Sequence, residues 1–307
     1  MLFTIAQQGH FLLTWLVLTA SALSLTMLMS GLLFRRYYWA PSYERWRFKS
    51  DPRFPAPTKI RREVLQMLRG VVMATLPPAI ALHLVDSGWS KAYGGLGEYG
   101  VGYLLLSAFI VWIGSDLFQW AYHYLGHRAR LAWARHKHHH AFHNPSPFAV
   151  IADDALDQLV RASPMLWLPL FMPVNMDMLF LTYSAIFYAY GVYLHLGFES
   201  RWLSAHHPWI NTSFQHYVHH ARSTIHKPMH VGFMFKLWDQ LAGSVYEAGP
   251  ESCLCARCCQ GRGERSREAW RAVHKPDYRP LLSLSFWLTG EQRPLELDGG
   301  ERCHVGE

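Results

Sequence analysis

The sequence predicts an all-α, polytopic membrane protein with about four membrane-crossing helices, one pair of them forming a hairpin, and a cytoplasmic cap of histidine-rich helices. Long stretches with almost no charge recur along the 307-residue chain, which is 50% hydrophobic and 15% aromatic. Most of its 19 histidines lie between His123 and His230, where they form short clusters. These two observations indicate helices that are buried in lipid and that end at a polar, histidine-rich layer.

Three stretches reach or exceed the ~20 apolar residues that cross a bilayer as a helix. They are residues 11–34, 101–122 and 165–194. The first has no charged residue, and each of the others has a single aspartate. We expect the third and longest stretch to enter and return as a hairpin, hinged near Pro173. Residues 70–85 form a shorter apolar stretch that contains Pro77-Pro78, so they predict a kinked span, which membrane helices tolerate.

The distribution of lysine and arginine predicts which side of the membrane each loop faces. Residues 35–69 contain ten of them, whereas residues 86–100 contain only Lys91. Basic loops stay in the cytoplasm, so the first loop and, by threading, all the histidine clusters are expected there. The net charge of +7 then reflects contact with anionic lipid rather than with nucleic acid. We expect an integral protein of the bacterial inner membrane, or of the endoplasmic reticulum in a eukaryote.

The chain divides into three regions. Residues 1–100 hold the N-terminal spans and the basic loop, and residues 101–246 hold the histidine clusters. Residues 247–307 form a C-terminal tail in which charge and glycine become more frequent. Within this tail, only Leu281 to Leu288 are expected to be able to pack on the rest of the chain.

Four of the five cysteines lie close together in the tail, in the motif Cys253-Leu-Cys255-Ala-Arg-Cys258-Cys259. This spacing matches no zinc ribbon, because a second spaced pair is missing. The motif leaves three interpretations open: a metal site, acylation near the membrane, and reduced cysteines that serve no function.

The histidine clusters have spacings that suit metal binding. They are His123-Tyr-Leu-Gly-His127, His136-Lys-His138-His139-His140 and His216-Tyr-Val-His219-His220. Helical residues four apart share a face, and positions 1, 4 and 5 of a His-x-x-His-His run lie within an arc of about 100°. Each cluster can therefore direct two or three imidazoles toward one point. His138 lies about 200° from His136 on the helix, so its ring is expected to point away.

The number of clustered histidines predicts two metal ions, since a tetrahedral zinc takes only four ligands. Imidazole suits iron, zinc, copper and nickel. Other interpretations are a set of hydrogen-bonded core histidines and a phosphate-binding basic surface, but three clusters with the same helical geometry favour metal. A histidine-lined metal transporter is a further alternative, although its ligands would lie near the bilayer midplane rather than at the ends of spans.

A metal centre at the membrane face suits a substrate that is dissolved in lipid. Abstraction of hydrogen from an unactivated C–H bond needs a redox-active metal, which iron is and zinc is not. We therefore favour an iron enzyme that uses O₂.

The histidine pattern resembles that of the fatty acid hydroxylase/sterol desaturase superfamily of membrane di-iron oxidases. The resemblance covers roughly residues 60–246, so that residues 101–246 correspond to the di-iron domain. The flanking segments are most similar to the sterol C5-desaturases, also called lathosterol oxidases. These segments are Ser146-Pro-Phe-Ala149, Pro208-Trp-Ile-Asn211 and Leu237-Trp-Asp-Gln-Leu-Ala-Gly-Ser244.

The resemblance implies nine iron ligands: His123, His127, His136, His139, His140, His195, His216, His219 and His220. His195 rests mainly on this resemblance. It further implies two irons, O₂ as co-substrate, and a lipid substrate that is desaturated or hydroxylated and is sterol-like. Fatty acyl, sphingoid or carotenoid lipids are the alternative substrates. The chain has no haem, Rossmann or ferredoxin motif of its own, so an external donor of the ferredoxin or cytochrome b5 type is expected.

Two further residues are expected to support the ligands. Asp116 lies seven residues before His123 on the same helical face, so it either accepts a ligand's N–H or is a helix-end charge. His230 stands where the resembling enzymes have asparagine, and it is expected to replace a polar group beside the site. No catalytic residue is predicted beyond the metal ligands.

Overall fold

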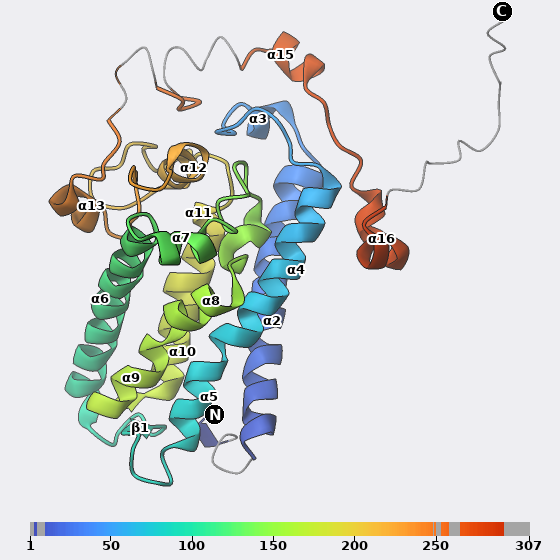
Figure 1. Cartoon of the computed structure of the whole chain (residues 1–307). Helices are drawn as coiled ribbons and strands as arrows, with labels where there is room; N and C mark the ends of the chain where they lie inside the picture. The colour runs from blue at the N-terminus through green and yellow to red at the C-terminus, as the bar shows by residue number, and fades with distance from the viewer. Residues whose placement is uncertain (1–2, 5–9, 248, 250–252, 258–264, 292–307) are drawn as a thin grey trace, which may run out of the picture.

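The computed structural model describes residues 3–4, 10–247, 249, 253–257 and 265–291, and it is predominantly helical. Three helical stretches in this part of the chain are long and apolar enough to cross a membrane: Phe11–Trp39, Pro57–His83 and Gly100–Gly126. The first is α2 (Phe11–Phe34) extended by the π-helical turn η1 (Arg35–Trp39), and the third is α6 (Gly100–Gly126). Figure 1 shows these helices running roughly alongside one another.

The kinked span forms, but it is longer than the sequence predicted. It consists of α4 (Pro57–Ala74) and α5 (Leu76–His83), which meet at Thr75. Pro77 and Pro78 have no N–H to continue the ladder, so the Met73 and Ala74 carbonyls four residues earlier lose their helical donors. The Thr75 hydroxyl at the junction lies 3.1 Å from the Val71 and Val72 carbonyls. The span begins at Pro57 rather than near residue 70 because the charged start of α4 belongs to the same continuous helix.

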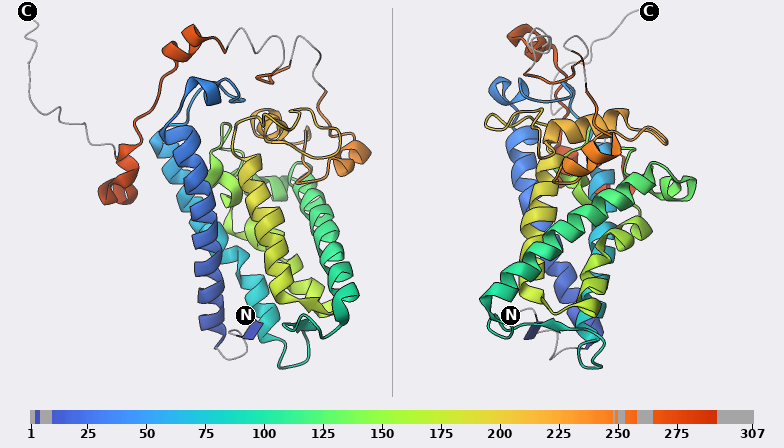
Figure 2. Two further views of the ribbon diagram at one scale, coloured as in Figure 1. Left: turned by 180° about the vertical axis from the view of Figure 1, so that it is seen from behind. Right: turned by 90° about the vertical axis from the view of Figure 1, so that its left-hand side faces the viewer.

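The predicted hairpin is present beside these helices, but its first arm begins at Ala155 rather than near residue 165. Its first arm is α8 (Ala155–Ala162) and α9 (Pro164–Phe171), and its second arm is α10 (Met176–Thr182), η3 (Tyr183–Ala189) and α11 (Tyr190–Leu194). Between the arms, β2 (Val174–Asn175) pairs in parallel with β1 (Ala92–Tyr93). The hairpin thereby returns the chain to the end of the bundle where α6 finishes (Figure 2).

A cap of short elements covers that end of the bundle (Figure 1). It contains α3 (Tyr43–Trp46), α7 (Arg130–His136), the 3₁₀ turn η2 (Pro147–Ile151), α12 (Ser213–Arg222) and α13 (Leu237–Ala242). The described part of the tail adds α15 (Arg267–Ala272), η4 (Arg279–Leu282) and α16 (Leu284–Thr289). The tail packs on the bundle: Arg61 of α4 donates to the Trp287 carbonyl at 2.7 Å.

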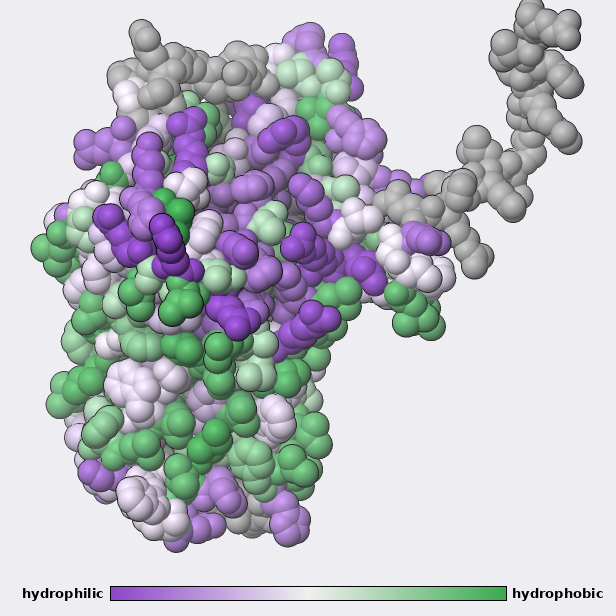
Figure 3. All heavy atoms as spheres, in the orientation of Figure 1, coloured by the Kyte–Doolittle hydropathy of each residue, from purple (hydrophilic) through white to green (hydrophobic). Residues whose placement is uncertain are grey.

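The outer surface of the bundle is strongly apolar. Leu16 and Leu32 of α2, and Leu105 and Leu106 of α6, are all more than half exposed. Figure 3 shows hydrophobic residues over the lower part of the molecule and hydrophilic residues over the cap. An exposed apolar surface of this extent marks contact with a membrane, so the cap lies at or beyond one edge of the lipid.

Candidate metal centre

All nine predicted ligands meet beneath α12, where they form two groups. The first group is His123, His127, His136, His140 and His219, and the second is His139, His195, His216 and His220. Within each group, one ring nitrogen of every histidine lies within 4.8 Å of the others, and every residue is buried. Two separate sets of imidazoles agree with the two metals that the sequence predicted.

Each His-x-x-His-His motif is divided between the groups. His136 and His140 enter the first group while His139 enters the second, and His219 enters the first while its neighbour His220 enters the second. The two residues four apart stay together because they lie in one row along the helix. Each motif thus directs two imidazoles toward one point, within the two or three that the spacing predicted, and the third ring lies beside that row and faces the neighbouring group.

The second cluster also differs from the expected helix. Helix α7 ends at His136, and the following turn is held by hydrogen bonds from His139 N and His140 N to the His136 carbonyl, at 3.0 and 3.4 Å. The helical geometry persists far enough for His138 to be exposed, as predicted. The third cluster lies on a regular helix, which begins at a capping box formed by Thr212 and Gln215.

Ring nitrogens inside each group approach one another closely. The Nε2 atoms of His136 and His140 are 3.1 Å apart, and those of His216 and His220 are 3.2 Å apart. The His195 Nε2 lies 3.0 Å from that of His216. Zinc–imidazole bonds are about 2.1 Å long, so adjacent ligands on such an ion lie roughly 3.0–3.4 Å apart. These separations fit nitrogens that share one cation.

Backbone carbonyls orient several of these rings. The Nδ1 atoms of His123, His195 and His219 lie 2.8 Å from the carbonyls of Val231, Gly191 and Met229, and that of His127 lies 3.1 Å from Thr224 O. A carbonyl only accepts, so each Nδ1 carries the proton and each Nε2 presents a lone pair. In the described chain, the Nε2 atoms of His123, His127 and His219 are buried without a hydrogen-bond partner. A metal would satisfy them.

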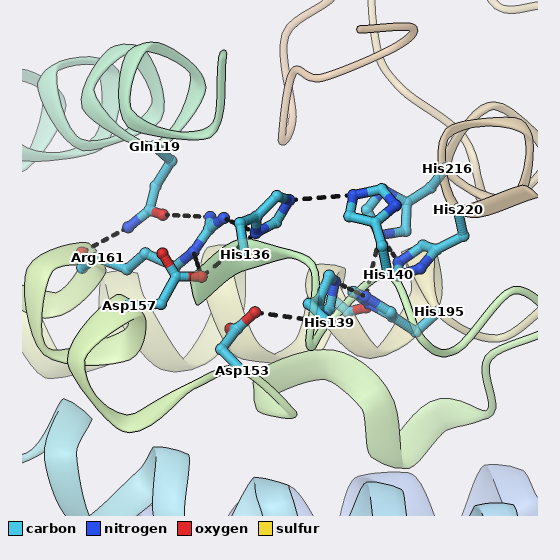
Figure 4. A network of polar contacts seen from close by, with 11 residues as sticks. Gln119, His136, His139, His140, Asp153, Asp157, Arg161, His195, His216 and His220 are labelled. Atoms are coloured by element: carbon cyan, nitrogen blue, oxygen red, sulfur yellow. Dashed lines mark hydrogen bonds and ion pairs between the residues drawn. The ribbon is translucent and has the colours of Figure 1, made fainter. Parts of the chain in front are cut away.

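Two carboxylates lie beside two of the remaining rings, His136 and His139, and neither was predicted from the sequence. Asp157 Oδ2 lies 3.3 Å from His136 Nδ1, and Asp153 Oδ1 lies 3.1 Å from His139 Nδ1. Figure 4 shows both carboxylates facing the histidines from α8 and the residues just before it. The signal in the sequence was the group of acidic residues Asp153, Asp154 and Asp157 soon after the second cluster. Arg161 completes the network, with its Nε 3.5 Å from Asp157 Oδ2.

Burial keeps the ligand rings neutral. It is the largest cause of the lowered pKa of His139, His140, His216, His219 and His220, and nearby histidines lower these pKa values further. Burial likewise lowers the pKa of His127 to about 3 and that of His195 to about 4. Neutral imidazole is the form that binds metal, so these rings are ready to act as ligands at neutral pH.

The pKa values of the two carboxylates, Asp153 and Asp157, are shifted in opposite directions. Burial raises the pKa of Asp153 to about 7. Burial also acts to raise the pKa of Asp157, but the Arg161 charge and the His136 hydrogen bond outweigh it, so that this pKa is lowered. Asp157 is therefore the carboxylate that holds a negative charge beside the site, and it balances the buried Arg161 guanidinium.

Acidification should destabilise the protein through these rings. The His195 pKa is about 4 in the folded chain against an ordinary value of 6.5. Unfolded chains therefore bind more protons in this window, and the stabilisation present above about pH 6.5 is lost as the pH falls toward 4. We expect the free energy of unfolding to fall by about 1.4 kcal/mol per pH unit for each such ring. Thermal unfolding of detergent-solubilised protein at several pH values measures this; a flat profile from pH 7 to 5 would contradict it.

Asp116 does not orient a ligand, contrary to one of the two roles considered for it. Its carboxylate accepts hydrogen bonds from Met234 N at 2.9 Å and from Trp238 Nε1 at 2.8 Å. Seven residues of helix separate Asp116 from His123 by about 10 Å, which is too far for a hydrogen bond. Asp116 instead fixes the loop whose Val231 carbonyl faces the His123 ring.

His230 belongs to neither group of ligands. It is buried, has a left-handed backbone conformation with φ of 49°, and donates its backbone N–H to Ser244 O at 2.8 Å. The same loop is held by Asp239, which accepts from Val231 N at 2.9 Å and Gly232 N at 2.8 Å. Asp239 comes from the Leu-Trp-Asp segment, and this contact gives that segment a structural role.

Comparison with known proteins confirms the resemblance inferred from the histidines. Residues 108–244 match the fatty acid hydroxylase family. Human lathosterol oxidase is 30% identical over 61% of each chain, and the Δ7-sterol 5(6)-desaturase of Schizosaccharomyces pombe is 30% identical over 59% of this chain and 56% of its own length. A Δ7-sterol 5(6)-desaturase of Aspergillus fumigatus is 27% identical over 78% of this chain and 77% of its own.

The matched region covers only part of the mammalian relatives. The chain spans 61% of the length of the mouse and human lathosterol oxidases. No solved structure matches the chain.

Proposed function

We propose that this chain, whose residues 108–244 match the fatty acid hydroxylase family, is a membrane oxidoreductase that desaturates or hydroxylates a sterol-like lipid with O₂ and external electrons. The observation that carries the proposal is the pair of buried imidazole groups at the edge of the apolar bundle. Iron bound there would supply the redox chemistry that an unactivated C–H bond requires. A metal transporter is disfavoured because the ligands lie at the end of the bundle rather than at its middle.

A cavity beside the second histidine group offers a place for the lipid. His139, His195 and His216 line one side of it. The other walls combine apolar side chains such as Ile151, Phe187 and Phe233 with the polar Gln119, Asp153, Gln158 and Arg161. The apolar side chains can contact a hydrocarbon framework, while the histidine side would hold the reacting carbon close to the metal ligands.

A second apolar cavity extends from this one toward the lipid-facing side of the bundle. The two cavities share Met165, Tyr183 and Tyr188 as lining residues. The second is also lined by α2, through Ala22 and Leu25 among others, and by the start of α5. We propose that a lipid enters between α2 and α10 from within the membrane, passing the three shared side chains.

Tryptophan at Ala22 should obstruct this route without disturbing the metal ligands. Forcing a large side chain into such a path costs on the order of 1–3 kcal/mol, so we expect KM for the lipid to rise about tenfold. The matched control is Ser24→Trp, on the same helix but at an exposed position. Equal KM values for both variants, with iron content unchanged, would rule out this route.

The cap provides a docking surface for the electron donor. Arg128, Arg130, Arg135 and Lys137 are exposed around α7, beside the first histidine group. A basic surface attracts an acidic carrier, which supports a donor of the ferredoxin or cytochrome b5 type. We propose that this cap faces the cytoplasm, as the basic loop of residues 35–69 supports. A cysteine at position 138 should then be labelled only by reagents that reach the cytoplasm.

The proposed activity is tested in a host that lacks its own sterol C5-desaturase. Expression of the chain should convert a Δ7-sterol into a product that is two hydrogens lighter, or one oxygen heavier if the reaction is hydroxylation. His139→Ala expressed at the same level is the control. Changes confined to fatty acyl, sphingoid or carotenoid lipids would favour the alternative substrates. A lipid profile identical to that of the control, for every lipid class, would refute the enzyme assignment.

A further inference from the structure

A third group of metal-binding side chains lies in the cap, apart from the nine histidines. It consists of His206, Cys253 and Cys255, whose ligand atoms all lie within 4.8 Å of one another. His206 Nε2 is 3.4 Å from Cys253 Sγ. None of these residues belongs to either histidine group. The three come from two segments separated by 47 positions, because the tail folds back onto the loop before α12.

Backbone N–H groups face both sulfur atoms. Cys253 Sγ accepts a hydrogen bond from Cys255 N at 3.4 Å, and Cys255 Sγ accepts one from Arg257 N at 3.3 Å. Backbone N–H donors directed at sulfur stabilise its negative form and orient it. Cys255 is also buried, at 2% exposure, so its position is fixed by packing.

The loop that contains His206 is held in place by contacts of its own. Glu199 lies just upstream of the His206 loop, and it accepts a hydrogen bond from Ala256 N at 2.6 Å. Its second carboxylate oxygen accepts a hydrogen bond from the Cys255 thiol at 3.3 Å, and a metal bound at this sulfur would take the place of that proton. The Thr212 hydroxyl donates to the Ala205 carbonyl at 2.7 Å, which ties the His206 loop to the start of α12. The tail cysteines and His206 are thus presented to one another by independent contacts.

We propose that His206, Cys253 and Cys255 bind one zinc ion that fastens the C-terminal tail to the loop preceding α12. Two thiolates and one imidazole form a softer donor set than the nine histidines, and such a set selects zinc. Three protein ligands leave the fourth tetrahedral position for water. The sequence motif alone could not indicate this site, because its histidine lies far from the cysteines along the chain. Cys258 and Cys259 lie outside the described residues.

The test uses the full chain, purified without a histidine tag and analysed for zinc and iron together. We expect about one zinc per chain in the unaltered protein, and none in Cys255→Ser, Cys253→Ser or His206→Ala. Iron content should remain unchanged in all three, which also shows that each variant folds. His138→Ala is the control, because it removes an exposed histidine outside every group, and it should retain zinc.

A second measurement follows the thiols directly. Alkylation of Cys253 and Cys255 should be slow in the zinc-loaded protein and should accelerate at least tenfold after a chelator removes zinc. An unaltered protein without zinc, zinc content that persists in Cys255→Ser, or alkylation that the chelator does not change would each overturn the proposal. A disulfide between Cys253 and Cys255 in protein isolated under reducing conditions would also overturn it. Any of these outcomes would overturn the zinc proposal alone. The oxidase proposal would stand, because it rests on the nine histidines.

Discussion

Alanine at His139 should empty the second metal position and abolish oxidation, whereas alanine at His138 should preserve both. His139 lies 3.3 Å from the His195 Nε2 and belongs to a buried group of four imidazoles, while His138 is exposed on the opposite face. Loss of a ligand should reduce iron affinity by more than the ~10–100-fold typical of losing an outer hydrogen-bond partner. Iron analysis and lipid turnover of the two purified variants provide the measurement.

His140→Ala adds a comparison within the same turn. His140 belongs to the first group and His139 to the second, so each variant should lose mainly a different one of the two irons. Each should retain about one iron per chain, with distinct spectra. If His138→Ala were as damaging as His139→Ala, the assignment of faces in this turn would be wrong. Identical residual iron spectra for His139→Ala and His140→Ala would contradict the division into two groups.

Asparagine at Asp153 should weaken the second metal position without removing a ligand. The Asp153 carboxylate lies 3.1 Å from His139 Nδ1 and is buried. Asparagine has nearly the same shape, but it replaces the carboxyl group that faces His139 Nδ1 with an amide, whose oxygen is a weaker acceptor and whose nitrogen cannot accept at all. We expect iron affinity at this position to fall about 10–100-fold, with a matching loss of turnover at limiting iron. Titration of iron into metal-free protein measures the affinity.

The adjacent Asp154→Asn is the matched control. Asp154 caps α8 by accepting from Leu156 N at 3.1 Å, and asparagine is an equally good cap. Asp154→Asn also replaces a carboxylate by an amide, one position away, but it leaves the contact between Asp153 and His139 in place. Equal iron affinity in the two variants would show that Asp153 does not act through the ring. Recovery of turnover in Asp153→Asn at saturating iron would support an effect on binding.

The sequence predicted where the ligands gather but not how they divide. Three apolar stretches, a kink at Pro77-Pro78 and a hairpin near Pro173 could be recognised because lipid imposes length and hydrophobicity on each span. The spacing of His136, His139 and His140 identifies a face of a helix. That spacing does not show where helix α7 ends or how α7 is rotated relative to α12. Those two features decide which histidine ring joins which group.

The groups that face the Nδ1 atoms of the ligand rings could not be predicted from the sequence for a related reason. Asp153 and Asp157 follow the second cluster by more than a dozen residues, and only the packing of α8 against α7 brings them to the histidines. Asp116 shows a second limit, because a shared helical face left contact with a ligand open as one of its two roles, whereas the rise along α6 keeps Asp116 away from His123. Backbone carbonyls such as Val231 O carry no signal in a sequence at all.

The count of metal ions in the purified protein is the most direct test of the histidine centre. Protein expressed with ample iron, purified without a histidine tag and analysed for all transition metals should contain about two irons per chain. Removal of the tail zinc by a mild chelator should not change that number. Two irons would fill the groups around His123 and His195. One zinc with no iron would contradict the central claim, because no redox-active metal would then be present to oxidise a lipid.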